Sequence, residues 1–147
     1  MSADAGAPAA PAMSLEQVQT ILDTSPFIRL LRMRAVSLDR ERQQVVIEMP
    51  LAPEFERWPG TGQAHGGVIA TLIDVAGDFA LVILLGGGVP TINLRIDYLR
   101  PAGGGRLVAA ATVRRAGRTI GVVDVEVSDG SGRLAAIGRG CYAMTVG

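Results

Sequence analysis

The pattern of polar and apolar residues changes from helical spacing to strand spacing within the first third of the chain. Ser14 and Gln17 have the spacing of a capping box, and the apolar residues behind them predict a short amphipathic helix that ends before Pro26. Residues 31–38 and 43–49 have the pattern of strands, and the segment between them is short enough for a hairpin. This part of the chain therefore predicts one helix followed by one β-hairpin.

A longer apolar run follows, and its pattern is helical again. From residue 68 to about residue 85 the apolar residues fall on nearly every side of a helical wheel, which is typical of a helix enclosed by protein. The run is about long enough to span a bilayer. However, Asp74 and Asp78 lie near its centre, where each carboxylate would cost about 2.5 to 3.5 kcal/mol in a membrane. The pattern therefore favours a helix buried in protein.

The remainder of the chain has strand patterns. Apolar and polar residues alternate over residues 92–98, up to Pro101, and three further strands are predicted at residues 107–114, 119–127 and 134–145, with glycine-containing turns between them. An enclosed helix with strands before it and hairpin-linked strands after it predicts an antiparallel sheet curled around a central helix, an α+β architecture.

Length and composition limit the number of domains and the kinds of partner. At 147 residues the chain suits one domain, predicted at residues 13–147, after an Ala- and Pro-rich tail at residues 1–12 without the features of a secretory signal. Fourteen basic residues balance fourteen acidic ones without a basic stripe, so nucleic acid is not an expected partner. The two aspartates in the apolar run argue against a membrane as a partner. With a single cysteine, Cys141, and a single histidine, His65, we expect a cytoplasmic protein without a metal site.

Asp74 is the residue that most requires an explanation. Burying an ionised carboxylate without a partner costs several kcal/mol or raises its pKa, so a chain that keeps a carboxylate in an apolar helix usually uses it. The same helix is opened by the polar turn His65-Gly66-Gly67. Asp74 is therefore the first candidate for chemistry.

Three features in order carry a resemblance to a known family. They are the turn His65-Gly66-Gly67, the helical carboxylate Asp74, and residues 91–101, which read TINLRIDYLRP. With these features the chain resembles the hotdog-fold acyl-CoA thioesterases, specifically the PaaI-like branch, over roughly residues 30–145. The resemblance implies an antiparallel sheet wrapped around a long helix, and hydrolysis of an acyl-CoA to free acid and CoA without a cofactor.

The resemblance also implies catalytic roles for individual residues. The backbone N–H of Gly66, at the positive end of the helix, would polarise the thioester carbonyl. Asp74 would act either as a general base on water or as a nucleophile that forms a mixed anhydride. Thr91 would help to position the water, or it is simply a strand-edge threonine, and His65 would support the turn or take part directly.

The spacing of Gly66 and Asp74 adds a requirement for a second chain. The two residues are eight positions apart, about 12 Å along a helix axis, whereas groups that act on one carbonyl must lie within about 3 Å of the reacting atoms. A two-fold partner with an antiparallel helix would bring Gly66 of one subunit to Asp74 of the other. We therefore expect a homodimer, and pairing of dimers into a tetramer stays open.

The chain departs from the family pattern at Pro59. An Asn or Gln commonly lies seven residues before the first glycine of the motif and supplies a second contact to the carbonyl, but Pro59 has no N–H to offer. Gln63 is the nearest amide side chain and is predicted as its replacement. The alternatives are a site with fewer donors, or a branch with another substrate and little activity.

Further residues are predicted to bind the substrate. Gly67 belongs to the motif, and Asp78 lies on the same helical face as Asp74, where it either shares the site or faces a polar loop or the dimer seam. A CoA nucleotide needs cationic partners for its phosphates, and the arginines best placed for this are Arg100, Arg114, Arg115 and Arg118.

Two other functions remain open at the level of sequence. A hotdog hydratase or dehydratase would use His65 and a carboxylate to exchange protons with the acyl chain. A non-catalytic acyl-CoA-binding module would bind tightly without turnover. The acyl group itself is not specified by the residues, because loop geometry decides which aromatic side chains line a pocket. The candidates are Phe27, Phe55, Trp58, Phe79, Tyr98 and Tyr142.

Overall fold

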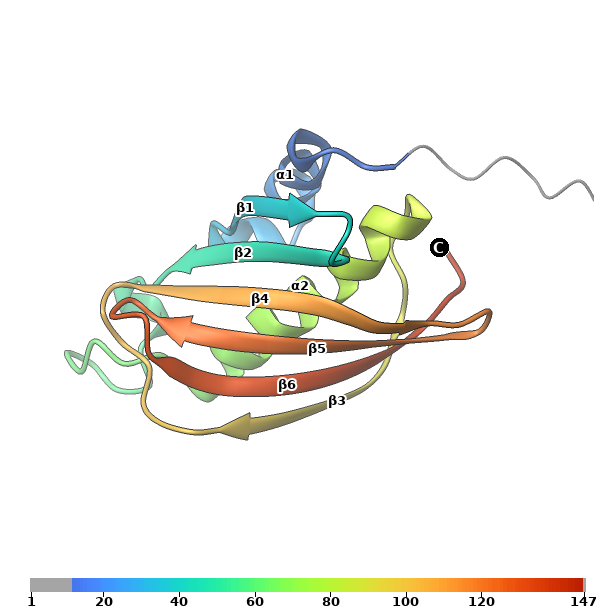
Figure 1. The fold of residues 1–147 in the computed structure, drawn as a ribbon. Helices are drawn as coiled ribbons and strands as arrows, with labels where there is room; N and C mark the ends of the chain where they lie inside the picture. The colour runs from blue at the N-terminus through green and yellow to red at the C-terminus, as the bar shows by residue number, and fades with distance from the viewer. Residues whose placement is uncertain (1–11, 147) are drawn as a thin grey trace, which may run out of the picture.

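The long helix α2 (Gly66–Leu85) lies against one face of a single sheet (Figure 1). The computed structural model describes residues 12–146, so the predicted tail at residues 1–12 lies outside the described residues except for Ala12. The strands in chain order are β1 (Arg34–Asp39), β2 (Gln44–Pro50), β3 (Thr91–Tyr98), β4 (Arg106–Ala116), β5 (Ile120–Asp129) and β6 (Leu134–Ala143). They pair antiparallel in the order β1-β2-β4-β5-β6-β3. This confirms the predicted α+β architecture.

Helix α1 (Leu15–Thr24) covers the β1 edge of the sheet. Its predicted capping box is confirmed, because the Gln17 backbone N–H donates to Ser14 Oγ and the Ser14 N–H donates to Gln17 Oε1. Gln19 then supplies β1 with polar partners: its Oε1 accepts from the Ala35 N–H at 2.8 Å and its Nε2 donates to the Met33 carbonyl at 3.2 Å. An edge strand covered in this way is protected from pairing with other chains.

The predicted strand at residues 31–38 begins later than expected. Leu31 is instead the last residue of the short 3₁₀ helix η1 (Ile28–Leu31), and Arg32 has a left-handed backbone with φ 52°. That conformation ends the turn and redirects the chain into β1, and the apolar pattern alone does not indicate it. The other predicted strands and the long helix differ from the observed elements by at most two residues at either end.

Most of α2 is buried. By length and hydropathy the helix could span a bilayer. In this fold, however, 61% of its most apolar stretch is buried inside the protein, chiefly against β4, β5 and β6. Its first turn is capped by His65, and it ends at Gly86, whose φ of 76° is readily adopted only by a residue without a Cβ. The predicted burial of this helix in protein is confirmed for the sides that face the sheet.

Two glycines allow β6 to approach α2 closely. A Cβ on Gly77 would overlap the hydroxyl of Tyr142, and a Cβ on Gly138 would lie 2.6 Å from Cγ2 of Ile73. Tyr142 itself is completely buried. The middle of the helix and the last strand are therefore packed with no room for a larger residue, which fixes the turn of α2 that carries Asp74.

Candidate active site

The first turn of α2 is held by side chains from two directions. Nδ1 of His65 accepts from the Gly67 N–H at 2.9 Å, so this nitrogen carries no proton. The hydroxyl of Tyr98, at the end of β3, donates to the Gly66 carbonyl at 2.8 Å. Among the described residues, none accepts a hydrogen bond from the Gly66 N–H. A free backbone donor therefore lies at the positive end of the helix.

Asp74 lies two turns further along α2 and reaches the beginning of β3. The Thr91 hydroxyl donates to Oδ1 of Asp74 at 2.8 Å, so the structure brings these two predicted residues together. Oδ2 of Asp74 has no hydrogen-bond partner among residues 12–146. The carboxylate is half-buried, with one oxygen held and the other available.

Asp78 faces the connection between α2 and β3. Its Oδ1 accepts from the Val89 N–H at 3.1 Å. The pKa of Asp78 is raised to about 6, chiefly by burial and to a smaller extent by the nearby charge of Asp74. The hydrogen bond from Val89 partly offsets this rise. Of the surroundings predicted for Asp78, the structure shows the contact with a polar loop. Its predicted role in substrate binding stays a prediction.

An uncovered stripe runs along α2 on the side that carries Asp74. Gly67, Thr71, Asp74 and Asp78 follow one another at helical spacing, and all four are partly or fully exposed, whereas the remaining sides of the helix are mostly buried. The stripe continues onto the edge strand β3, where Ile92 is 54% exposed. The alternation over residues 92–98 predicts a strand with one buried face. In a single chain, Leu94 and Ile96 are half-buried, and the other apolar residues of the strand are exposed.

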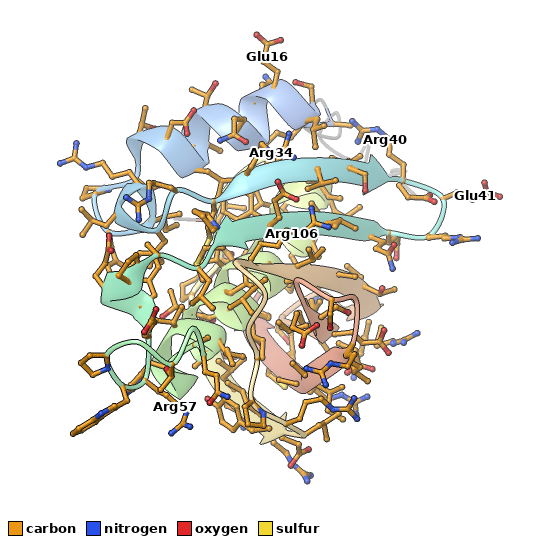
Figure 2. The ribbon with its side chains drawn as sticks, turned by 90° about the vertical axis from the view of Figure 1, so that its left-hand side faces the viewer. Glu16, Arg34, Arg40, Glu41, Arg57 and Arg106 are labelled. Carbon is orange, nitrogen blue, oxygen red and sulfur yellow. The ribbon has the colours of Figure 1, made fainter. Side chains whose placement is uncertain are left out.

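Gln63 lies in the loop between η2 (Pro53–Phe55) and α2, and its amide oxygen is occupied. Its Oε1 accepts from Arg57 Nε at 2.7 Å, and its backbone carbonyl accepts from the Arg57 N–H at 2.8 Å. Figure 2 shows Arg57 in this loop, away from α1 and Glu16. Pro59 is exposed in the same loop. These contacts tie the loop together, and the predicted contact of Gln63 with substrate stays a prediction.

The predicted CoA-binding arginines do not gather at one place. Arg114 lies on the outer face of the sheet, where Asp124 accepts from its Nε at 2.9 Å and from Arg139 as well. Arg115 and Arg118 lie at the hairpin between β4 and β5, and Arg100 follows β3, at the opposite end of the sheet. Within the described chain these last three form no ion pair.

One surface hollow lies apart from the candidate catalytic residues. A hollow of about 460 Å³ lies on the outer face of the sheet, lined by polar residues such as Arg95, Arg114 and Asp124, and it is separate from Gly66 and Asp74. Residues 12–146 contain no group of three or more His, Cys, Asp or Glu side chains that could hold a metal ion.

The pattern of the sequence does not reveal two contacts of this region. Tyr142 on β6 donates its hydroxyl to the Asp74 carbonyl at 3.1 Å, and Tyr98 holds the Gly66 carbonyl. Both tyrosines are visible in the sequence only as possible pocket walls. Their roles depend on strand register, which brings residues 68 and 32 positions apart into contact.

The sequence was compared with models of known protein families. The family model of the thioesterase superfamily matches residues 61–136, which include the helix-opening turn, Asp74 and Thr91. The chain belongs to the thioesterase superfamily. The predicted resemblance to the hotdog thioesterases of the PaaI-like branch is thereby confirmed at the level of family and fold.

Individual relatives of this thioesterase-superfamily protein agree with the family. It is 31% identical to the medium/long-chain acyl-CoA thioesterase YigI of Escherichia coli over 121 residues, 69% of this chain and 74% of YigI. It is 43% identical over 96 residues to a Halobacterium salinarum protein named as an esterase, covering 58% of this chain but only 63% of that protein. The solved structure of the E. coli PaaI protein, from the phenylacetic acid degradation operon, matches with 26% identity and a TM-score of 0.76 over 91% of this chain and 98% of PaaI.

The raised pKa of Asp78 predicts a pH-dependent effect on the stability of this thioesterase-family fold. Because the folded protein holds the Asp78 proton more tightly than the unfolded chain does, this group favours folding most below about pH 4, and that contribution is lost as the pH rises through about 6. Asp78→Asn, which stays neutral and can still accept from the Val89 N–H, should therefore be more stable than wild type at pH 7.5. The gain should be at most roughly 3 kcal/mol, at 1.36 kcal/mol per pKa unit.

Thermal unfolding at pH 5 and pH 7.5 measures this effect. The advantage of Asp78→Asn over wild type should shrink at pH 5, while Asp97→Asn, a half-exposed carboxylate on β3, serves as the control and should show no such change. An equal difference in Tm at both pH values would contradict the assignment.

Proposed function

We propose that this protein hydrolyses acyl-CoA thioesters to a free acid and CoA, with Asp74 as the reacting carboxylate. The observation that carries the proposal is the position of that carboxylate on the uncovered stripe of α2. Thr91 holds Oδ1 at 2.8 Å, while Oδ2 has no hydrogen-bond partner in the described part of the chain. A carboxylate kept in this way on an apolar helix is suited to chemistry. Membership in the thioesterase superfamily supports the reaction class.

The proposed reaction uses two groups of the protein. The free N–H of Gly66, at the positive end of α2, polarises the thioester carbonyl and stabilises the negative charge that develops on its oxygen. Oδ2 of Asp74 either takes a proton from the attacking water or attacks the carbonyl carbon to form a mixed anhydride that water then opens. In both routes the acyl–sulfur bond breaks, an acyl–oxygen bond forms, and CoA leaves as a thiolate.

We also propose that two chains build each site. Gly66 and Asp74 lie on one helix, about 12 Å apart along its axis, which is too far for both to reach one carbonyl. The free edge of β3 and the uncovered stripe of α2 lie on the side of each chain that a two-fold partner with an antiparallel helix would cover. Partly exposed apolar side chains on that edge, such as Ile92 and Tyr98, support burial by a second copy.

The substrate class follows from the relatives only as a proposal. YigI is named as a medium/long-chain acyl-CoA thioesterase, so medium- and long-chain acyl-CoAs are the first substrates to assay for this chain. A release assay for the CoA thiol also separates the reaction classes. A hydratase would hydrate crotonyl-CoA without releasing thiol, and an acyl-CoA-binding module would bind it without turnover.

Asp74→Asn should remove activity and preserve substrate binding, because it keeps the shape of the side chain but not the base or nucleophile. We expect kcat to fall by about 10² to 10⁴-fold with KM little changed. The assay is thiol release from acyl-CoA, with Asp97→Asn on the same protein as the control. If Asp74→Asn kept more than a tenth of the wild-type kcat, Asp74 would not be the catalytic carboxylate.

Gln63→Ala tests whether the Gln63 amide replaces the contact that Pro59 cannot make. Loss of one donor to the developing oxyanion costs about 10² to 10³-fold in kcat, so we expect a fall of that order with KM little changed. Arg57→Ala is the matched control, because it frees the same loop contact without removing the amide. If both variants only lower Tm and leave kcat unchanged, Gln63 serves the loop alone.

A further inference from the structure

The connection between α2 and β3 is held by contacts from two elements. Asp78 on α2 accepts from the Val89 N–H at 3.1 Å, and the Ala143 N–H at the end of β6 donates to the Pro90 carbonyl at 2.9 Å. Thr91 follows at once and donates its hydroxyl to Asp74 at 2.8 Å. The position of the Thr91 hydroxyl therefore depends on how the two residues before it are held.

The local sequence gives this segment little stiffness of its own. Glycines occupy positions 86–88 directly before it, and glycine has the largest backbone freedom of any residue. Pro90 has no N–H to donate to the sheet. The pairing of β3 with β6 is irregular between Thr91 and Asn93, so the regular ladder begins only after Thr91. The hydrogen bond from the Val89 N–H to Asp78 therefore restrains a segment whose own backbone is not stiff.

Tyr142 holds the other side of Asp74. It is completely buried, and its ring and hydroxyl fill the space that the missing side chains of Gly77 and Gly140 leave. Its hydroxyl donates to the Asp74 carbonyl at 3.1 Å. Burial, together with the nearby charges of Asp74 and Asp78, raises the pKa of Tyr142, so the hydroxyl stays protonated and remains a donor.

We infer that Asp78 and Tyr142 are positioning residues, which hold the Thr91 hydroxyl and the Asp74 carboxylate in the relative geometry that the reaction needs. The inference rests on the proposed function, in which Asp74 is the reacting group. Asp78 acts through Val89 and the start of β3, and Tyr142 acts through the backbone of the helical turn. Neither side chain touches the substrate in this account.

The stability of the fold does not explain why Asp78 is a carboxylate. Burial raises its pKa to about 6, so at neutral pH the ionised group opposes folding. A neutral acceptor in its place would hold the Val89 N–H without that cost. A residue that costs stability beside a reacting group is common where function requires it.

The test compares kcat, KM and Tm for variants of the two residues. Asp78→Ala removes the acceptor for the Val89 N–H and should lower kcat by about 10²-fold, the effect of a misplacement of about 1 Å, with KM changed little. Asp78→Asn retains an acceptor oxygen but not the charge, so it should restore only part of that loss. Tyr142→Phe removes only the hydroxyl and should lower kcat by about tenfold, as expected for one hydrogen bond.

Asp129→Asn is the matched control. Asp129 is a buried carboxylate that accepts from the backbone N–H groups of Ser131 and Arg133 in the turn between β5 and β6. This variant should lower Tm and leave kcat at the wild-type value. If Asp78→Ala and Tyr142→Phe behaved like this control, both residues would be structural and the positioning role would be overturned.

A pH profile adds a readout that is independent of folding yield. The titratable groups that face Asp78 are Asp74 on α2 and Tyr142 on β6, with Cys141 beside Tyr142. As Asp78 ionises near pH 6, it becomes the stronger acceptor for the Val89 N–H, so kcat/KM of the wild type should rise through that pH. Asp78→Asn should lack this step. Identical profiles for the two proteins would overturn the role of Asp78, even if Asp78→Ala fails to fold.

Asp74→Asn in the same assay separates this inference from the proposed function. If Asp74→Asn is inactive while Asp78→Ala and Tyr142→Phe keep the wild-type kcat, the positioning role alone fails. If Asp74→Asn keeps its activity, the proposed function fails and the inference that rests on it fails with it.

Discussion

The hydrogen bond from the Thr91 hydroxyl to Oδ1 of Asp74 is the contact on which the proposed chemistry depends. It connects the enclosed helix α2 to the edge strand β3, across 17 residues of sequence, and gives a carboxylate on an apolar helix the partner that it needs. Because one oxygen is held, the other keeps a fixed direction without being satisfied. The irregular start of β3, the contact of Asp78 with Val89 and the packing of Tyr142 all lie beside this hydrogen bond, and we infer that the last two position it.

The geometry of α2 limits what one chain can do. The helix exposes a stripe of small and polar residues, from Gly67 to Asp78, while the sheet covers its other sides. A straight helix cannot bring its own first turn to Asp74, so in the proposed reaction the N–H of Gly66 and Oδ2 of Asp74 of one chain belong to different sites. Membership in the thioesterase superfamily agrees with a site at which a carboxylate and a backbone N–H meet on one carbonyl, and the proposed dimer supplies that meeting.

The parts of the fold that depend on local pattern were predictable from the sequence. A helix that is apolar on all sides must be enclosed, and Asp74 stands out because it contradicts that pattern. The late start of β1 was not predictable, because the left-handed backbone of Arg32 leaves no mark in the apolar alternation. The contact of Tyr142 was not predictable either, because it depends on which strand lies beside the helix and in what register. A polar loop contact was one of the positions predicted for Asp78, but its partner, the Val89 N–H, was not. Ile92 is a similar case. The alternation of apolar residues predicts that its side chain is covered, but within one chain it is exposed.

Activity of a mixed dimer tests the central claim most directly. Asp74→Asn and Gly66→Val chains, each inactive alone, would be given different tags and purified as the hybrid dimer. If two chains share each site, the hybrid contains one site with an intact Gly66 and an intact Asp74, and it should release thiol at about half the wild-type rate. A purified hybrid dimer without activity would contradict a site built from Gly66 of one chain and Asp74 of the other.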